Sequence, residues 1–310
     1  MNRRGLVVWL GFFVWRWTTT FAALQFDLGK KYGLDLSNPN APMHEGALRQ
    51  IMTGVHQEKP EAMYLFGLMQ YYGHGVTRDK EAAVRFFRKA AAERHLEAQF
   101  TLGLLHHTGD GGIDQDDSIA YSLLNAAANR GHADSQWLLG TMLQEGRGTT
   151  ANMARALELI QSSADNGNAR GKFHLGVFYE YGRAVPQNLT LAAQLYAEAA
   201  AENVAEGAFY LGLMHAYGRG FPQDFKRAFG LFKKAADWGH GPAMYYLGLM
   251  HTHGQGVEIN YDQALHWFQK AGLTRDPSIE EKATRAAREL KDLLVQVTER
   301  RRAVMSMPVT

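Results

Sequence analysis

The chain has 310 residues, of which 46% are hydrophobic and 21% charged, and its formal net charge is +2. This composition is typical of a globular protein with enough apolar residues for a core, and it excludes a disordered chain. The small positive charge does not indicate nucleic acid binding, which usually needs a clustered basic face. The absence of cysteine excludes disulfides, thiolate metal sites and cysteine nucleophiles.

An apolar stretch near the N-terminus points to a membrane or to a targeting pathway. Residues 6–15 are ten consecutive apolar or glycine residues that follow two arginines, and no acidic residue precedes Asp27. Three interpretations stay open for residues 1–21: a signal peptide, an uncleaved anchor over residues 6–23, and a mitochondrial targeting segment. We therefore expect a membrane-associated protein that contacts the bilayer through residues 1–23, either in a mitochondrial membrane or in the secretory pathway at the ER.

Residues 22–58 are interpreted as a degenerate first repeat of the series that follows. The sequence LQFDLGKKYG at 24–33 echoes AQFTLGLLHH at 98–107. In addition, Ala47 precedes Glu61 by the same 14 residues that separate the equivalent alanine and glutamate of the next unit.

Six clearer repeats follow, and each is marked by a glycine within a predicted helix. These marker glycines recur every 36 residues, with one interval of 37, at Gly67, Gly103, Gly140, Gly176, Gly212 and Gly248. Another glycine stands six residues after each marker, where a helix would end in a left-handed C-cap: Gly73, Gly109, Gly146, Gly182, Gly218 and Gly254. The first helix of each repeat is therefore predicted to end there.

A second helix is predicted in the latter half of each repeat. Strong N-cap residues stand where it would start, at Asp79, Asp116, Asn152, Asn188, Asp224 and Asn260. An alanine four residues later, and a large apolar pair three residues after that alanine, give the spacing of an amphipathic helix. Asn188 also heads a glycosylation sequon, but its N-cap position favours a structural role.

The marker glycines need a physical reason, because a glycine inside a helix costs about 1 kcal/mol relative to alanine. We expect each of them to face a small residue, so that two helices can approach closely. Three residues before each marker an aromatic residue recurs, and these are predicted core residues: Tyr64, Phe100, Trp137, Phe173, Phe209 and Tyr245.

The segments EAQFTLGLLHHTG at 97–109 and GAFYLGLMHAYGRGFPQDFKRAFGLFKKAADWGH at 207–240 resemble Sel1-like repeats, which are tetratricopeptide-related helical hairpins. The resemblance implies an all-α fold, a right-handed α-solenoid in which residues 59–276 form six stacked hairpins. It also implies a family whose members mostly act as scaffolds and adaptors for protein complexes. Ala184 departs from the pattern because it replaces a loop glycine.

Residues 277–310 are predicted to form a C-terminal capping helix followed by a tail. The helix would begin with Ser278 and Glu281, which have the spacing of a capping box. One face would carry Ala283, Ala286, Leu290, Leu293 and Val297 and would close the open end of the solenoid. The basic run that follows, at 300–302, is interpreted as a solvated helix end.

No catalytic constellation is found in the sequence. The Gly-x-Gly pairs follow helices rather than strands, so they are not a dinucleotide fingerprint, and the acidic loop at 110–117 lacks the glycine and glutamate of an EF-hand. His106, His215 and His251 share one repeat position, but stacked repeats would hold them about 10 Å apart. We predict a protein that is not an enzyme and takes no metal, cofactor, nucleic acid or small-molecule substrate.

A partner-binding surface is predicted on the first helix of the later repeats. The positions two before and five after each marker glycine lie two turns apart on one side of that helix, and they vary between repeats. The candidate partner-binding residues are His174, Tyr181, Tyr210, Tyr217, Tyr246 and His253. Aromatic anchors commonly dominate interfaces, but packing between neighbouring helices is an equally open interpretation.

The function predicted from these features is a non-catalytic, membrane-associated scaffold that binds the proteins of a larger complex, as a subunit or as an adaptor. The alternative is an assembly or quality-control factor with a cofactor-binding or enzymatic role.

Overall fold

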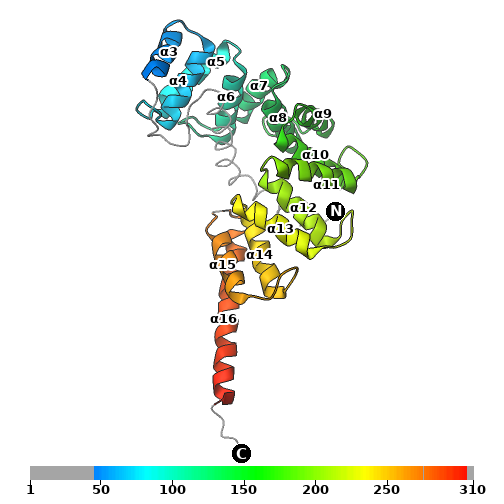
Figure 1. The fold of residues 1–310 in the computed structure, drawn as a ribbon. Helices are drawn as coiled ribbons and strands as arrows, with labels where there is room; N and C mark the ends of the chain where they lie inside the picture. Colours follow the sequence, from blue (N-terminus) through cyan, green and yellow to red (C-terminus); the bar gives the residue numbers. More distant parts are fainter. Residues whose placement is uncertain (1–44, 275, 306–310) are drawn as a thin grey trace, which may run out of the picture. The chain divides into compact units, whose positions relative to one another are not determined.

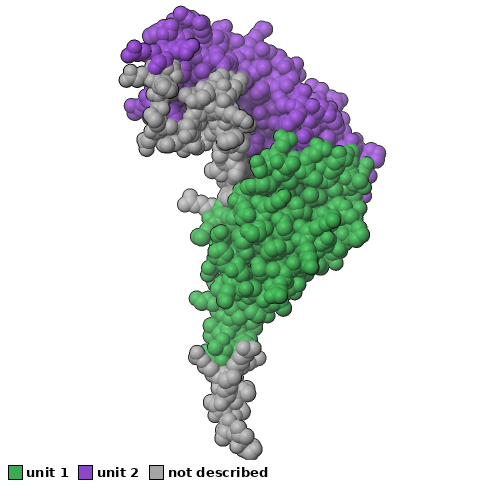
Figure 2. Space-filling model, viewed as in Figure 1, with its two compact units in different colours: residues 1–17, 188–310 green, residues 18–187 purple. Residues whose placement is uncertain are grey.

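The computed structural model describes residues 45–274 and 276–305, and the chain divides into two compact units (Figures 1 and 2). The expected membrane segment at 1–21 and most of the degenerate repeat at 22–58 lie outside the described residues. Within the described residues the structure contains fourteen helices and no strand, which confirms the all-α prediction.

The N-terminal unit covers the described residues up to 187 and is purple in Figure 2. Its helices are α3 (Glu45–His56), α4 (Pro60–Tyr72), α5 (Lys80–Ala92), α6 (Leu96–Thr108), α7 (Asp117–Ala128), α8 (Ala133–Glu145), α9 (Met153–Asp165) and α10 (Ala169–Tyr181).

The C-terminal unit begins at Asn188 and is green in Figure 2. It contains α11 (Leu189–Ala201), α12 (Ala205–Tyr217), α13 (Phe225–Asp237), α14 (Gly241–His253), α15 (Tyr261–Gly272) and α16 (Glu280–Met305). We call the first helix of each repeat helix A (α4, α6, α8, α10, α12 and α14) and the second helix B (α5, α7, α9, α11, α13 and α15).

The start of each helix B and the end of each helix A fall where the local sequence predicts them. Each predicted N-cap side chain accepts a hydrogen bond from a backbone N–H in the first turn of its helix B, as Asp79 does from Ala82 and Asn260 does from Gln263. Each helix A ends in a left-handed glycine, with φ between 62° and 83°. These caps satisfy backbone groups that the helix itself leaves unpaired.

Five of the marker glycines have a large residue of helix B as their nearest neighbour, which corrects the expectation of a small one. A small residue does lie beside two of them, since a Cβ at Gly67 or Gly140 would also come within 3.2 Å of the carbonyl oxygen of Ala83 or Ala156. A Cβ at Gly212 would come within 2.7 Å of the Phe232 ring. The same relationship joins Gly67 to Phe87, Gly103 to Leu124, Gly140 to Ile160 and Gly248 to Phe268. The glycine thus makes room for a large buried side chain of helix B, and the burial of that side chain offsets the low helix propensity of glycine.

Small residues do meet, but between helix B and the next helix A. Gly207 on α12 lies against Ala199 on α11, where a Cβ would approach to 2.9 Å. Gly54 on α3 has the same relationship to Ala62 on α4, eight residues later. In this respect α3 packs on α4 as a helix B packs on the following helix A.

The predicted aromatic core residues are buried, apart from Tyr245, which is half-buried. Tyr64, Phe100, Trp137, Phe173 and Phe209 are each at most 5% exposed. Tyr64 belongs to a core cluster with Phe87 in the N-terminal unit, and Phe209 belongs to one with Phe232 in the C-terminal unit. Each cluster joins residues of successive repeats, as stacked repeats require.

The C-terminal helix covers the end of the solenoid with only its first half. Ala283 and Leu290 on α16 are buried, and Leu290 clusters with Ala264 and Phe268 of α15. Leu293 and Val297 are 52% and 40% exposed, which corrects the prediction that the whole apolar face packs. The reason is length, since α16 has 26 residues whereas α15 has 12.

The start of α16 also differs from the prediction. The helix begins at Glu280, and Ser278 does not act as its N-cap. Instead the Asp276 carboxylate accepts hydrogen bonds from the Ser278 N–H at 2.9 Å and from the Ser278 hydroxyl at 2.6 Å.

Candidate protein interaction surface

The candidate partner-binding residues of the N-terminal unit have opposite environments. His174 on α10 is 4% exposed, and its ring lies 6.0 Å from Trp137 and 5.0 Å from Phe173. Tyr181 at the end of α10 is 48% exposed, with the Arg183 guanidinium 5.2 Å from its ring centroid. His174 therefore packs inside the repeat stack, whereas Tyr181 is accessible to solvent.

Tyr246 in the C-terminal unit combines packing with partial exposure. It is half-buried on α14, with its ring 5.5 Å from Phe209 and 5.2 Å from Phe232. Its hydroxyl lies 3.3 Å from the hydroxyl of Tyr217, which belongs to α12 and is 61% exposed. The structure thus joins two of the candidate residues across two consecutive repeats.

The two remaining candidates extend the same surface. Tyr210 is half-buried on α12, with its ring 5.5 Å from Tyr196 and 5.8 Å from Phe209. His253 ends α14 and is exposed. The positions before the marker glycine thus pack, and those after it reach solvent.

Two leucines that the sequence reasoning did not single out belong to this surface. Leu213 lies between Tyr210 and Tyr217 on one stripe of α12, and Leu249 lies between Tyr246 and His253 on α14. Both are half-buried, and their spacing of three and four residues from the aromatic positions could have identified them. We call the six residues Tyr210, Leu213, Tyr217, Tyr246, Leu249 and His253 the aromatic surface.

The phenol of Tyr246 is neutral at physiological pH. Burial, followed by the hydrogen bond with Tyr217, raises the pKa of Tyr246 well above its usual range. A neutral phenol can donate one hydrogen bond and accept others. Tyr246 therefore offers an apolar ring with an uncharged polar end, a combination that is enriched in protein interfaces.

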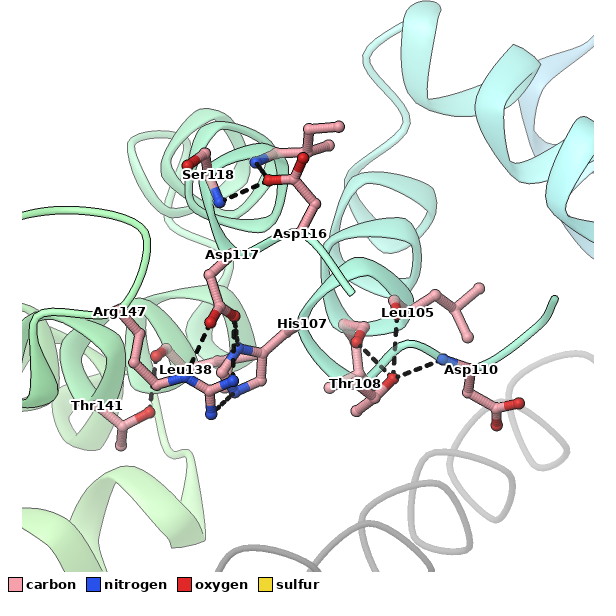
Figure 3. A network of polar contacts seen from close by, with 12 residues as sticks. Leu105, His107, Thr108, Asp110, Asp116, Asp117, Ser118, Leu138, Thr141 and Arg147 are labelled. Carbon is pink, nitrogen blue, oxygen red and sulfur yellow. Dashed lines mark hydrogen bonds and ion pairs between the residues drawn. The ribbon is translucent and has the colours of Figure 1, made fainter. Parts of the chain in front are cut away.

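A polar network that the sequence did not predict lies in the N-terminal unit (Figure 3). His107 of α6 is 1% exposed, and its Nδ1 lies 2.6 Å from the Asp117 carboxylate at the start of α7. Arg147, in the loop after α8, donates to Asp117 at 3.0 Å and approaches the His107 Nε2 at 3.2 Å. Three segments from two consecutive repeats are held together by these contacts.

The network fixes the tautomer of its histidine. Because the guanidinium can only donate, the His107 Nε2 must accept and its Nδ1–H must donate to Asp117. Burial, and then the nearby charge of Arg147, lower the pKa of His107. Both ring nitrogens are occupied, so the arrangement favours a structural role over a general base.

The acidic loop between α6 and α7 is more structured than a solvated loop. Asp110 accepts hydrogen bonds from the Tyr71 hydroxyl at 2.6 Å and from the Lys80 ammonium at 2.7 Å.

Across the described residues, histidine and acidic side chains do not gather in groups of three or more that could hold a metal ion.

In the part of the chain that the structure describes, every helix is too short or too polar to cross a bilayer.

The fold and its surface define an α-solenoid of stacked helical hairpins. The Sel1 repeat model matches six consecutive segments, at residues 60–95, 96–132, 133–168, 169–204, 205–240 and 241–273. The chain therefore belongs to the Sel1 repeat family, whose members generally act as protein interaction scaffolds.

Solved structures agree with this assignment. A Sel1 repeat protein from Oxalobacter formigenes is 32% identical, with a TM-score of 0.68 over 73% of this chain and 90% of that protein. A protective antigen of uropathogenic Escherichia coli, c5321, has the same repeat fold, with 24% identity and a TM-score of 0.63 over 79% of this chain and 56% of the antigen.

Curated relatives match over shorter stretches. An F-box protein of Arabidopsis thaliana is 30% identical over 96 residues, which are 30% of this chain and 24% of that protein. A protein of Neisseria meningitidis is 36% identical over 88 residues, which are 28% of this chain and 18% of the relative. The chain thus spans less than a quarter of the length of each.

Proposed function

We propose that this Sel1 repeat protein is a membrane-associated scaffold that acts as a subunit or adaptor of a larger protein complex, and that the aromatic surface is where a partner protein binds. The observation that carries the proposal is the Tyr217–Tyr246 pair. Tyr217 is 61% exposed although it is a large aromatic residue, and its hydroxyl is positioned by a packed tyrosine of the next repeat. A rigid aromatic residue beside an uncharged polar group is typical of an interface anchor.

The membrane part of the proposal is supported by the apolar sequence at residues 6–15. It leaves the mitochondrial membrane and the ER as the two locations to be tested.

The binding site is best tested with residues that the solenoid core does not need. Tyr217→Ala together with His253→Ala removes two exposed side chains of the aromatic surface. Tyr210 and Tyr246 are less suitable, because their rings contact core residues. Tyr261→Ala is the matched control, since Tyr261 is 41% exposed on helix B of the same unit.

The experiment purifies each full-length variant from its native membrane in mild detergent and measures which proteins co-purify and at what stoichiometry. We expect a partner that the double variant loses and that the Tyr261 variant keeps. A partner that both variants retain would contradict the assignment of the aromatic surface. The absence of any stoichiometric partner of the wild-type protein would contradict the role as a complex subunit.

A further inference from the structure

The solvent-facing side of α13 is densely basic. Lys226, Arg227, Lys233 and Lys234 are all exposed on this 13-residue helix. Their spacing of one, six and one residues places them on one face, because a helix turns once every 3.6 residues. Gly230 lies in the middle of that face, and a Cβ there would meet nothing within 4 Å. The face is therefore flat at its centre and positive around it.

Lys270 of α15 extends this charge to the neighbouring helix. Its ammonium lies 5.1 Å from the centroid of the Trp267 ring, and the Lys233 ammonium lies 5.9 Å from the same centroid. The two cations therefore share one aromatic ring. We call Lys226, Arg227, Lys233, Lys234 and Lys270 the basic face.

Nearby acids do not neutralise the basic face. Asp224 lies 3.4 Å from Arg227, and Asp237 lies 3.5 Å from Lys233. All four of these side chains are at least 39% exposed, so water screens both pairs. Five positive and two negative side chains leave a formal charge of +3 on the face.

The repeat fold itself does not require this charge. In α11, one repeat earlier, the positions equivalent to the four basic residues of α13 are Thr190, Leu191, Ala197 and Glu198. In α15, one repeat later, they are Asp262, Gln263, Gln269 and Lys270. The accumulation of cations is thus absent from α11, and in α15 only Lys270 remains of it. Among the other helices of this position, α5 also carries exposed cations, at Arg85, Arg88 and Lys89.

The chemistry of the face fits an extended negative surface better than a protein pocket. Four of its five cations are lysines, which act as mobile point charges, whereas arginine gives the bidentate contacts of specific recognition. No large apolar side chain of α13 is exposed that could anchor a protein partner. Clusters of basic residues near a bilayer gain attraction from each positive charge.

We propose that the basic face is a contact surface for anionic lipid headgroups. This inference deepens the membrane association proposed above and rests on it. A second, electrostatic contact is what an apolar segment needs for stable membrane binding when one signal alone is marginal.

The test measures co-sedimentation of the full-length chain with two kinds of vesicle, phosphatidylcholine alone and phosphatidylcholine with about 30% phosphatidylserine. Wild-type protein is expected to prefer the anionic vesicles, and the preference should fall as salt is raised. The variant Lys226→Glu, Lys234→Glu, Lys270→Glu should lose about tenfold or more of its anionic binding and keep its neutral binding.

The matched control is Arg85→Glu, Arg88→Glu, Lys89→Glu on α5, which changes the net charge equally at exposed positions of a helix B in the other unit. This control should retain the preference, and circular dichroism should show both variants folded.

Three results would overturn the proposal: equal wild-type binding to the two vesicles, equal loss in the control, or binding of polyglutamate in place of anionic vesicles. The last would indicate an acidic protein partner. If the proposed membrane contact of residues 1–23 is wrong, the wild-type protein will not bind neutral vesicles. That result differs from each of the three results that would overturn the role of the basic face.

Discussion

The hydroxyls of Tyr217 and Tyr246 lie 3.3 Å apart although 29 residues separate them in the sequence, and the two rings have different surroundings. Tyr217 is 61% exposed, whereas Tyr246 packs against Phe209 and Phe232. We expect Tyr217→Ala to lower the free energy of unfolding by less than about 1 kcal/mol and Tyr246→Ala to lower it by about 2 kcal/mol or more. Urea denaturation followed by circular dichroism measures both. Equal effects would show that the pair packs as one unit.

The marker glycine and an exposed glycine should respond oppositely to the same substitution. A Cβ at Gly212 would meet the buried Phe232 ring at 2.7 Å, so Gly212→Ala should destabilise the protein by about 1–3 kcal/mol. Gly230 lies within α13 with free space around it, and Gly230→Ala should stabilise the protein by about 1 kcal/mol. Thermal unfolding of the two variants decides this, and a stabilising Gly212→Ala would refute the packing role.

The network around His107 should contribute more than an exposed ion pair. Arg147→Ala removes donors to Asp117 and to the His107 Nε2, and we expect a loss of about 1–3 kcal/mol. The control is Arg155→Ala, which breaks an exposed pair with Glu158 and should cost less than about 0.5 kcal/mol. The two variants are compared by their urea midpoints, and a similar midpoint would place the network among the weak surface contacts.

A buried histidine should make stability depend on pH. Burial lowers the pKa of His240 to about 4, below the value near 6.5 that the unfolded chain has. Between these values the unfolded state binds more protons, so the stability from this group is complete above pH 6.5 and is lost as the pH falls toward 4. The loss is on the order of 3 kcal/mol.

The contribution of His240 can be tested by replacing it with asparagine, a residue that can cap the helix but does not titrate. The imidazole Nδ1 accepts the Ala243 N–H, and Asn168 caps α10 from the equivalent position of its repeat. His240→Asn should therefore fold and should show a smaller fall in unfolding free energy between pH 7 and pH 4.5. An unchanged pH dependence would mean that other groups, such as His107, dominate it.

Replacing the loop residue Ala184 by glycine should raise the stability of the protein. Its φ is 55°, in the left-handed region that costs a non-glycine residue about 1 kcal/mol. We expect Ala184→Gly to stabilise the protein by up to about 1 kcal/mol after the added freedom of the unfolded chain is subtracted. Ala197→Gly, at an exposed position within α11, should instead destabilise it by a similar amount. Thermal unfolding of both variants measures the contrast, and two destabilised variants would contradict it.

The sequence by itself determined the positions of the helix ends and the repeat unit. The N-caps from Asp79 to Asn260 and the left-handed glycines from Gly73 to Gly254 act within three or four residues of the backbone groups they satisfy, so their spacing predicted the repeats and the helix ends. The repeat pattern also predicted the Sel1 fold, because hairpins of this length bury their apolar faces only by stacking.

The tertiary structure decided which side chain meets which neighbour. It placed Phe232 against Gly212 and left Tyr217 exposed while Tyr246 packed. On α16 it buried Leu290 and left Leu293 exposed. It also brought together His107, Asp117 and Arg147 from two repeats. These contacts join residues ten to forty positions apart, and burial depends on the shape of the helix that packs alongside, so periodicity within one helix cannot determine them.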